Sequence, residues 1–300
     1  MTKKISELSA ATTPLAGTET VEIVQGGVSK KVAVSYLAGS GLAVREILTS
    51  ARTYYVRTDG SNSNDGLSNT SGGAFLTIQK AIDTVSGALD IGNYDVTIQV
   101  GDGTYTGANS LKPVLAGTGT VTIQGNTGAM SSVIINPTAA TCFTTSASGY
   151  LWTLRYMKLT TTTSGAGIYV GAGSRVYYNN IDFGACPSSA HVIAEQGGKA
   201  QCNGSYSITG AAAYHNQAIS YGEIRTTGAY TITITGTPAF TTYAYSGLGF
   251  IHYASVTFSG SATGKRYDVV ENGLIKTYGG GASFLPGGTA GTTATGGQYT

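Results

Sequence analysis

Apolar and polar residues alternate in short phrases that recur along the second half of the chain. Each phrase contains two apolar residues two positions apart, so in a strand both side chains would point to the same face. The phrases centre on Met157 and Leu159, Ile181 and Phe183, Tyr206 and Ile208, Tyr230 and Ile232, and Val256 and Phe258. Glycines precede them at intervals of 24, 25, 24, 25 and 26 residues: Gly149, Gly173, Gly198, Gly222, Gly247 and Gly273. A fixed period of this length indicates a repeat architecture.

The repeat unit predicts one coil of a β-solenoid. About 25 residues hold two or three short strands, and the abundance of glycine and β-branched residues excludes long helices. Equivalent residues of successive coils then stack about 4.8 Å apart. Counted back from the next repeat glycine, His191, His215 and Phe240 hold the same position, seven residues earlier. The register therefore predicts a stack of these three rings. We interpret it as a packed ladder, with a sugar-binding strip or a metal pair as alternatives.

The pattern divides the chain into four zones. They are a leader over residues 1–50, an opening region over 51–140, the regular repeat over 141–285 and a Gly- and Thr-rich tail over 286–300. In the leader, residues 19–24 and 30–34 are predicted strands, joined by a glycine turn at 25–28 that predicts a hairpin. This leader is too small to hold a core of its own.

The opening region contains one predicted helix. Ile78, Ala81, Ile82 and Val85 follow the spacing of one helical face. Strands are predicted at 53–57, 96–100, 120–123 and 133–135. Since the end of a solenoid exposes unpaired backbone, we expect the amphipathic helix to cover that end.

Composition narrows the classes of function. Charged residues are 11% of the chain and the net charge is +2, with no clustered Lys and Arg, which argues against nucleic-acid binding. Three cysteines without close spacing give neither a disulfide framework nor a zinc site, and a buried thiol is expected at Cys202. No apolar run is long enough for a membrane span, and no secretory signal follows Met1. We therefore expect synthesis in a host cytoplasm.

Two stretches resemble known protein families. Residues 54–60 (YYVRTDG), 64–68 (NDGLS), 75–82 (FLTIQKAI), 96–100 (VTIQV) and 103–105 (GTY) resemble the opening of pectin-lyase-like right-handed β-helices, which are common in bacteriophage tail spikes and fibres. Residues 4–8 (KISEL), 15–19 (LAGTE) and 23–31 (IVQGGVSKK) resemble the N-terminal attachment segments of phage tail and head-fibre proteins. The resemblance implies an all-β fold, a right-handed parallel β-helix with a short capping helix and a small attachment segment. It also implies a homotrimer that is anchored to other virion proteins through residues 1–50, and hence a place in the virion.

The positions of the carboxylates in the repeat indicate whether the scaffold could carry an active site. Hydrolysis of a glycan needs two carboxylates roughly 5–10 Å apart. The repeat contains Glu195, Glu223, Asp182, Asp268 and Glu271, and the first two are predicted on adjacent coils but not stacked. Asp268 and Glu271 come close in sequence, but Lys265 and Arg266 beside them predict a solvated ion cluster as the alternative to a catalytic pair. We therefore expect no catalytic residue, and we also predict no metal and no cofactor.

Taken with these observations, the resemblance implies a non-enzymatic structural protein of a phage particle, a trimeric tail fibre or spike that contacts a host surface glycan. The alternatives are a polysaccharide depolymerase on the same scaffold and a capsid head fibre or decoration protein without a ligand. The predicted virion-attachment residues are Ile5, Leu8, Leu15, Val21, Ile23, Val24 and Val28. The predicted glycan- or interface-contact residues are Tyr177, Tyr178, His191, His215, Tyr243, Tyr245 and Tyr253. Residues 59–69 suit either a cation loop or plain turn chemistry.

Overall fold

The computed structural model describes residues 20–33, 45–114, 116–145 and 151–300 of the chain. The chain divides into two units, Met1–Glu46 and Ile47–Thr300. A short strand, β3 (Glu46–Ile47), lies at the boundary between them. Each unit is described by itself.

The first unit contains the predicted hairpin. Strands β1 (Thr20–Gln25) and β2 (Val28–Ala33) pair antiparallel, with Gln25 opposite Val28. Gly26 and Gly27 between them have φ of 63° and 76°, the left-handed conformation that a two-residue hairpin turn requires and glycine accepts without strain. Val24 and Val28 are 73% and 59% exposed. Among the predicted attachment residues, Ile5, Leu8 and Leu15 lie outside the described residues.

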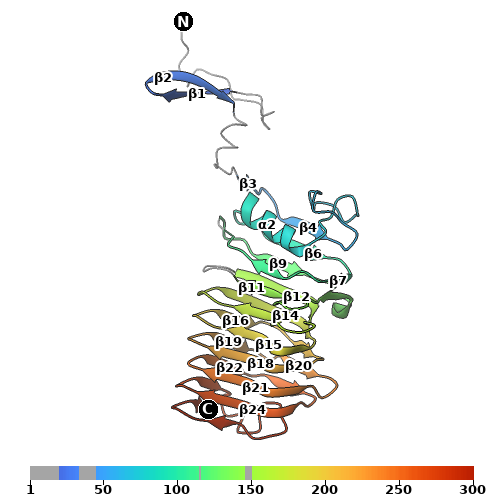
Figure 1. Ribbon diagram of the computed structural model, residues 1–300, viewed down its shortest axis with the longest axis vertical. Coiled ribbons are helices and arrows are strands. Elements are labelled where there is room, and N and C mark those ends of the chain that lie inside the picture. The colour runs from blue at the N-terminus through green and yellow to red at the C-terminus, as the bar shows by residue number, and fades with distance from the viewer. Residues whose placement is uncertain (1–19, 34–44, 115, 146–150) are drawn as a thin grey trace. The chain divides into compact units, whose positions relative to one another are not determined.

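The second unit is an all-β, right-handed parallel β-solenoid (Figure 1). Its strands form three rows that run along the stack. The first row is β4 (Arg52–Val56), β6 (Val96–Val100), β9 (Val121–Gln124), β12 (Leu151–Leu159), β14 (Arg175–Phe183), β16 (Lys199–Cys202), β19 (Glu223–Thr227), β22 (Phe250–Ala254), β25 (Leu274–Lys276) and β27 (Gln298–Tyr299). Neighbours in this row pair in parallel, as predicted.

Two further rows complete each coil. The second row is β7 (Gly103–Tyr105), β10 (Val133–Ile135), the later residues of β12 and β14, β17 (Tyr206–Ile208), β20 (Thr231–Ile234) and β23 (Thr257–Ser259). The third row is β8 (Asn109–Leu111), β11 (Phe143–Thr145), β13 (Ile168–Val170), β15 (Cys186–Ala194), β18 (Ala212–Ile219), β21 (Ala239–Gly247), β24 (Thr263–Val270) and β26 (Thr292–Thr293). Outside the rows lie β5 (Leu89–Asp90) and a 3₁₀ turn, η2 (Met130–Ser132).

The core fills the inside of the coils. Strand β6 shows the rule, because Val96, Ile98 and Val100 are buried and the residues between them are partly exposed. The interior also takes large rings, among them Trp152, whose indole N–H donates to the carbonyl of Lys112 at 3.0 Å. Buried aromatic side chains such as this one contribute a large share of the apolar area that stabilises the core.

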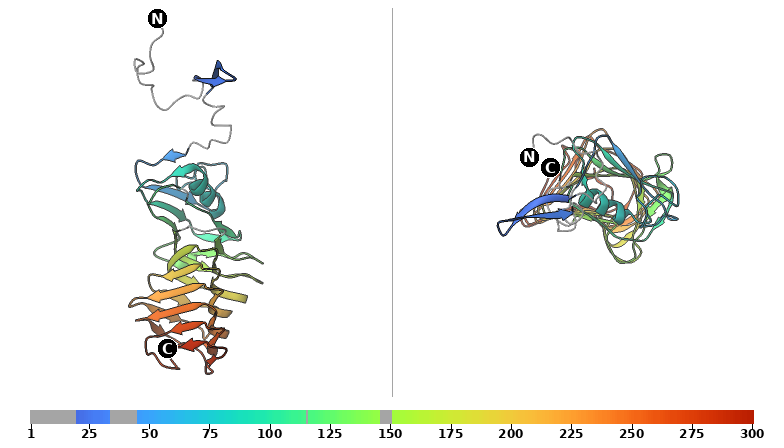
Figure 2. Two further views of the ribbon diagram at one scale, coloured as in Figure 1. Left: turned by 90° about the vertical axis from the view of Figure 1, so that its left-hand side faces the viewer. Right: turned by 90° about the horizontal axis from the view of Figure 1, so that it is seen from above.

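Helix α2 (Ile78–Ala88) packs against β4, β6 and β8 at the N-terminal end of the solenoid, where Figures 1 and 2 show it. Its buried residues include Ile78, Ala81, Ile82 and Val85, the predicted face. The hydroxyl of Thr77 accepts from the backbone N–H of Lys80 and caps the helix. The prediction that an amphipathic helix covers this end is confirmed.

The register of the coils differs from the one counted on glycines. The first-row partners are Arg175, Lys199, Glu223, Phe250, Leu274 and Gln298, so the intervals are 24, 24, 27, 24 and 24. The coil that begins at Glu223 is the long one. Compared with the preceding coil, it has two extra residues before Ile232 and two more before Phe240. It has one residue fewer at the corner before Phe250, so the net addition is three. The glycine equivalent to Gly222 is therefore Gly249, and the prediction that Gly247 marks this corner is wrong.

Candidate functional site

The predicted ring stack is correct for its two histidines and wrong for its third member. His191 and His215 align on neighbouring strands, between the pairs Ala190–Tyr214 and Val192–Asn216. The residue aligned with His215 on the next coil is Tyr243, while Phe240 aligns with Ala212. The long coil moves Phe240 out of the line, although its ring centroid still lies 6.2 Å from that of His215.

Five of the seven predicted contact residues lie in the interior. Each is 0% exposed: Tyr178, His191, His215, Tyr243 and Tyr253. Side chains enclosed by their own chain contact neither a glycan nor a partner chain, so these five are wrong as surface candidates. The inward positions of the strands fill with rings, because a wide parallel coil needs large side chains to close its core.

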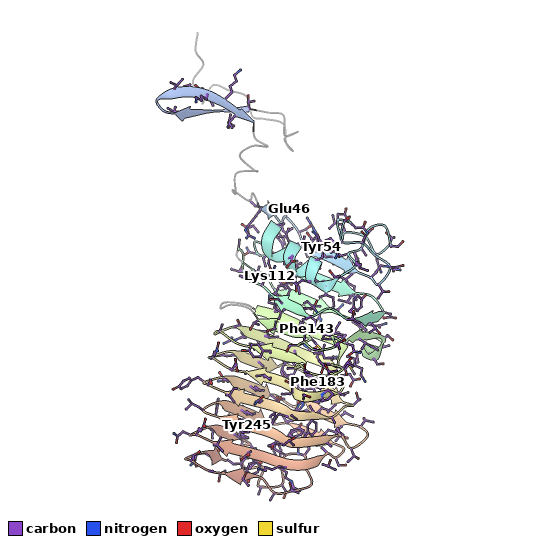
Figure 3. The ribbon with its side chains drawn as sticks, in the orientation of Figure 1. Glu46, Tyr54, Lys112, Phe143, Phe183 and Tyr245 are labelled. Atoms are coloured by element: carbon purple, nitrogen blue, oxygen red, sulfur yellow. The ribbon has the colours of Figure 1, made fainter. Side chains whose placement is uncertain are left out.

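The interior histidines form a hydrogen-bonded core cluster. The Nδ1 atoms of His191 and His215 are 3.0 Å apart, and the Tyr206 hydroxyl lies 2.7 Å from Nε2 of His215. Phe183, labelled in Figure 3, packs against both imidazole rings. Burial lowers the pKa of His191 to about 3 and lowers that of His215 well below its usual value. Both rings are neutral near pH 7, which favours the packed-ladder interpretation.

The remaining two candidates lie on different faces. Tyr177 belongs to the first row and Tyr245 to the third. The Tyr245 ring packs on Tyr214 with centroids 5.4 Å apart, and burial together with the nearby Glu271 carboxylate raises its pKa. They do not form a single surface.

The carboxylates of the repeat are held by neighbouring side chains. Asp182 pairs with Lys158 at 3.0 Å and Asp268 with Lys265 at 3.1 Å. The Tyr169 hydroxyl donates to Glu195. Glu223 aligns with Lys199 rather than with Glu195, so the prediction that the two glutamates do not stack is confirmed, as is an ion pair beside Asp268.

The outer side of the first row carries a cluster that sequence reasoning missed. On β14, Arg175 and Tyr177 face outward while Val176 and Tyr178 are buried, and the same alternation continues on the following strands. Two columns of outward residues result. One runs Arg175, Lys199, Glu223, Phe250 and Leu274, and the other runs Tyr177, Gln201, Arg225, His252 and Lys276. We call these two columns, together with Tyr278, the basic face.

Positive charge dominates this face. It carries four cations, Arg175, Lys199, Arg225 and Lys276, and one carboxylate, Glu223. A surface hollow of about 170 Å³ lies among Arg175, Lys199, Ala200, Gln201, Glu223 and Arg225. The Glu223 side chain is only 10% exposed and pairs with Lys199 at 3.1 Å and with Arg225, whose side chains are 47% and 46% exposed. The mostly buried Glu223 carboxylate thus fixes the positions of the two half-exposed cations, Lys199 and Arg225.

Opposing effects set the pKa of Glu223. Burial raises it, but hydrogen bonds and charge from Arg225 and Lys199 outweigh burial, so the pKa lies below its usual range. Glu223 is therefore ionised near pH 7, and the hollow keeps a surplus of positive charge.

Aromatic side chains lie at the C-terminal part of the basic face. The rings of Phe250 and His252 have centroids 3.8 Å apart, and Nδ1 of His252 lies 3.0 Å from the Tyr278 hydroxyl. The Lys276 ammonium sits 4.7 Å from the centre of the Tyr278 ring, close enough for a cation–π contact. Burial, followed by the charge of Arg225, lowers the pKa of His252, so this ring offers a neutral stacking surface.

The loop at residues 59–69 follows turn chemistry. Asp59 pairs with Arg57 at 2.8 Å, and the Asp65 carboxylate accepts from the backbone N–H of Leu67. The Asn62 side chain accepts from the backbone N–H groups of Leu76 and Thr77. These bonds account for the polar residues without a cation.

Other classes of site are not represented in the part of the chain that the structure describes. Among those residues, no group of three or more His, Cys, Asp or Glu side chains is placed to hold a metal ion, and none of the helices has the length and apolar character of a membrane crossing. Cys142, Cys186 and Cys202 are free and buried, as expected for Cys202.

The fold and this face define the chain as a parallel β-solenoid protein with a basic outer face. Comparisons with protein-family models, with curated proteins and with solved structures give no match for the chain.

Proposed function

We propose that this chain is a non-enzymatic structural protein of a bacteriophage particle, a homotrimeric tail fibre or spike that contacts polysaccharide on the host surface. The observation that carries the proposal is the basic face. It presents aromatic, amide and cationic side chains on consecutive coils of a rigid scaffold, as Tyr177, Gln201 and Arg225 do. Rings that stack on sugars and donors that bind hydroxyls or acidic groups are what a linear glycan requires.

The placement in a virion is supported by the leader. Its sequence resembles phage attachment segments, and its hairpin leaves Val24 and Val28 exposed. A two-stranded hairpin is marginal alone, and exposed apolar residues on it suit packing against another protein of the particle or against the same segment of two further copies. In this proposal the solenoid projects outward from that attachment.

Binding is favoured over cleavage by the state of the carboxylates. A depolymerase on this scaffold is the first alternative, and its hydrolytic form needs two carboxylates that face one sugar. Glu223 is neutralised by Lys199 and Arg225, and Asp182 by Lys158. A head fibre or decoration protein without a ligand is the second alternative, and the exposed cations of the basic face argue for a ligand instead.

Three measurements test the proposal. Deleting residues 1–40 is expected to abolish incorporation into particles while the β-sheet circular dichroism persists, and particles that still incorporate the truncated chain would refute the attachment. Sedimentation at micromolar concentration is expected to give a trimer, and a monomer would refute that assembly.

Incubation with host capsule or lipopolysaccharide is expected to give binding without new reducing ends or absorbance at 235 nm, whereas either product would identify a depolymerase.

A further inference from the structure

We propose that the basic face binds an acidic polysaccharide, with the carboxylates of a linear glycan lying against Arg175, Lys199, Arg225 and Lys276. The inference deepens the proposed function and rests on it, because it names the chemical class of the glycan that this face takes.

The arrangement of the cations favours a polymer over a small anion. Arg175 and Lys199 occupy adjacent coils of one column, and Arg225 and Lys276 lie in the other column. Neighbouring coils are about 4.8 Å apart, so the four coil steps from the Arg175 strand to the Lys276 strand cover about 19 Å. One anionic group does not reach across this length, whereas a chain that carries an acidic group at intervals does.

The hollow supplies one defined anion position along this path. Arg175, Lys199 and Arg225 surround it, and Glu223 beneath them neutralises only one of these three charges. Its volume of about 170 Å³ suits a carboxylate and its neighbouring atoms rather than a whole sugar chain. Arginine binds a carboxylate through two parallel N–H donors, which gives orientation as well as charge.

The rings of this face suit stacking on sugars, and the low net charge of the chain argues against nucleic acid. Tyr177 lies at one end of the second column and His252 near the other, so a glycan that runs along it meets rings at two separated points with a cation between them. Nucleic-acid binding draws on many backbone contacts, and the whole chain carries a net charge of only +2. A duplex is therefore not the partner that this face fits.

The test compares two ligands that differ only in charge. Full-length protein is titrated with alginate, a linear polyuronate, and with the same alginate after its carboxylates have been reduced to alcohols. We expect binding to alginate that weakens at least tenfold between 50 mM and 500 mM NaCl, and at least tenfold weaker binding to the reduced polymer.

Substitutions locate the site. Arg175→Ala with Lys276→Ala removes two cations that pair with no carboxylate among the described residues, so no carboxylate loses its partner, and we expect the Kd for alginate to rise at least tenfold. A second variant, Lys199→Ala, Glu223→Gln and Arg225→Ala, removes three of the charged groups that line the hollow and leaves no buried carboxylate unpaired. The control for the change in net charge is Lys112→Ala with Lys265→Ala, two cations outside the basic face that pair with Asp83 and Asp268, and its Kd is expected to stay within twofold of the wild type.

The outcomes separate the two claims. Equal binding of alginate and reduced alginate, binding of neither, or unchanged Kd values in both basic-face variants would overturn the acidic-glycan inference. A 20-base-pair DNA duplex that binds as tightly as alginate would also overturn it, since the face would then be a general polyanion surface. The proposed function fails separately, if host polysaccharide of any charge is not bound or if particles without this protein adsorb to the host normally.

Discussion

His191 and His215 face each other inside the solenoid with their Nδ1 atoms 3.0 Å apart. One of these nitrogens must donate a proton and the other must accept it, so the contact exists only while at least one of the rings is neutral. The Tyr206 hydroxyl at Nε2 of His215 continues the chain of bonds. The stability of this core therefore depends on the protonation state of His191 and His215.

Acid is expected to destabilise the protein before its carboxylates titrate. Burial lowers the pKa of His191 to about 3, whereas an unfolded histidine titrates near 6.5. Below about pH 6.5 the unfolded state therefore binds more protons than the folded state, and stability falls as the pH drops toward 3. Urea unfolding at pH 7.0 and 5.0 should show a clear loss of unfolding free energy at pH 5.0.

The histidine variants identify the cause. Replacing His191 and His215 together with Leu should remove most of the slope between pH 7.0 and 5.0, while His252→Gln should reduce it much less, because the pKa of His252 is also lowered but its ring is only partly buried on the outer face. A wild-type profile that is flat across this interval would contradict the assignment.

The corner before Gly222 gives a second prediction. Gly197 and Tyr221 occupy the same corner position on neighbouring coils, with φ of 73° and 66°. A left-handed conformation costs a non-glycine residue about 1 kcal/mol or more. Gly197→Ala should therefore lower the free energy of unfolding by about 1 kcal/mol. Tyr221 is 75% exposed and loses little packing when replaced, so Tyr221→Gly should raise stability by about 0.5 kcal/mol. Thermal and urea unfolding measure both, and shifts of the same sign would contradict the strain argument.

Much of the fold could be predicted from the sequence because its signals are local. The alternation of strands, the helix face from Ile78 to Val85 and the glycine turn of the hairpin each depend on neighbouring residues. The register failed at one coil because Gly247 stands near the corner glycine Gly249 and three added residues do not alter the alternation. Counting on glycines then placed Phe240 where Tyr243 lies.

The basic face was beyond sequence reasoning for a related reason. Arg175, Lys199, Arg225 and Lys276 are far apart in the chain and form no charged run. Only the true intervals of 24 and 27 residues bring them together. Tyr178 and Tyr253 were predicted at the surface because tyrosine has a polar hydroxyl. Both stand at inward-facing positions of their strands, so their rings are buried.

The three cysteines give a third prediction. All are free and buried, and burial raises the pKa of Cys186 to about 11 and that of Cys202 to about 12. Because the thiolate is the reactive form, a disulfide reagent at pH 8 should label none of them in the folded protein and all three in guanidinium chloride. Rapid labelling of a native thiol would contradict the buried positions.

The capping helix offers the fourth prediction, in which two alanine substitutions have opposite signs. Ile82 lies on the inner face of α2 and is fully buried, and truncation of such a side chain costs about 2–5 kcal/mol through lost burial and the cavity left behind. Gly87 lies in the last turn of the same helix with open space around the position of a Cβ, so Gly87→Ala should add about 0.5–1 kcal/mol by favouring the helical backbone. Urea unfolding of both variants provides the measurement, with Gly87→Ala as the control for handling and expression. If Ile82→Ala cost less than about 1 kcal/mol, α2 would not be sealing the end of the stack, and the edge strands beneath it would have to be protected by another part of the protein.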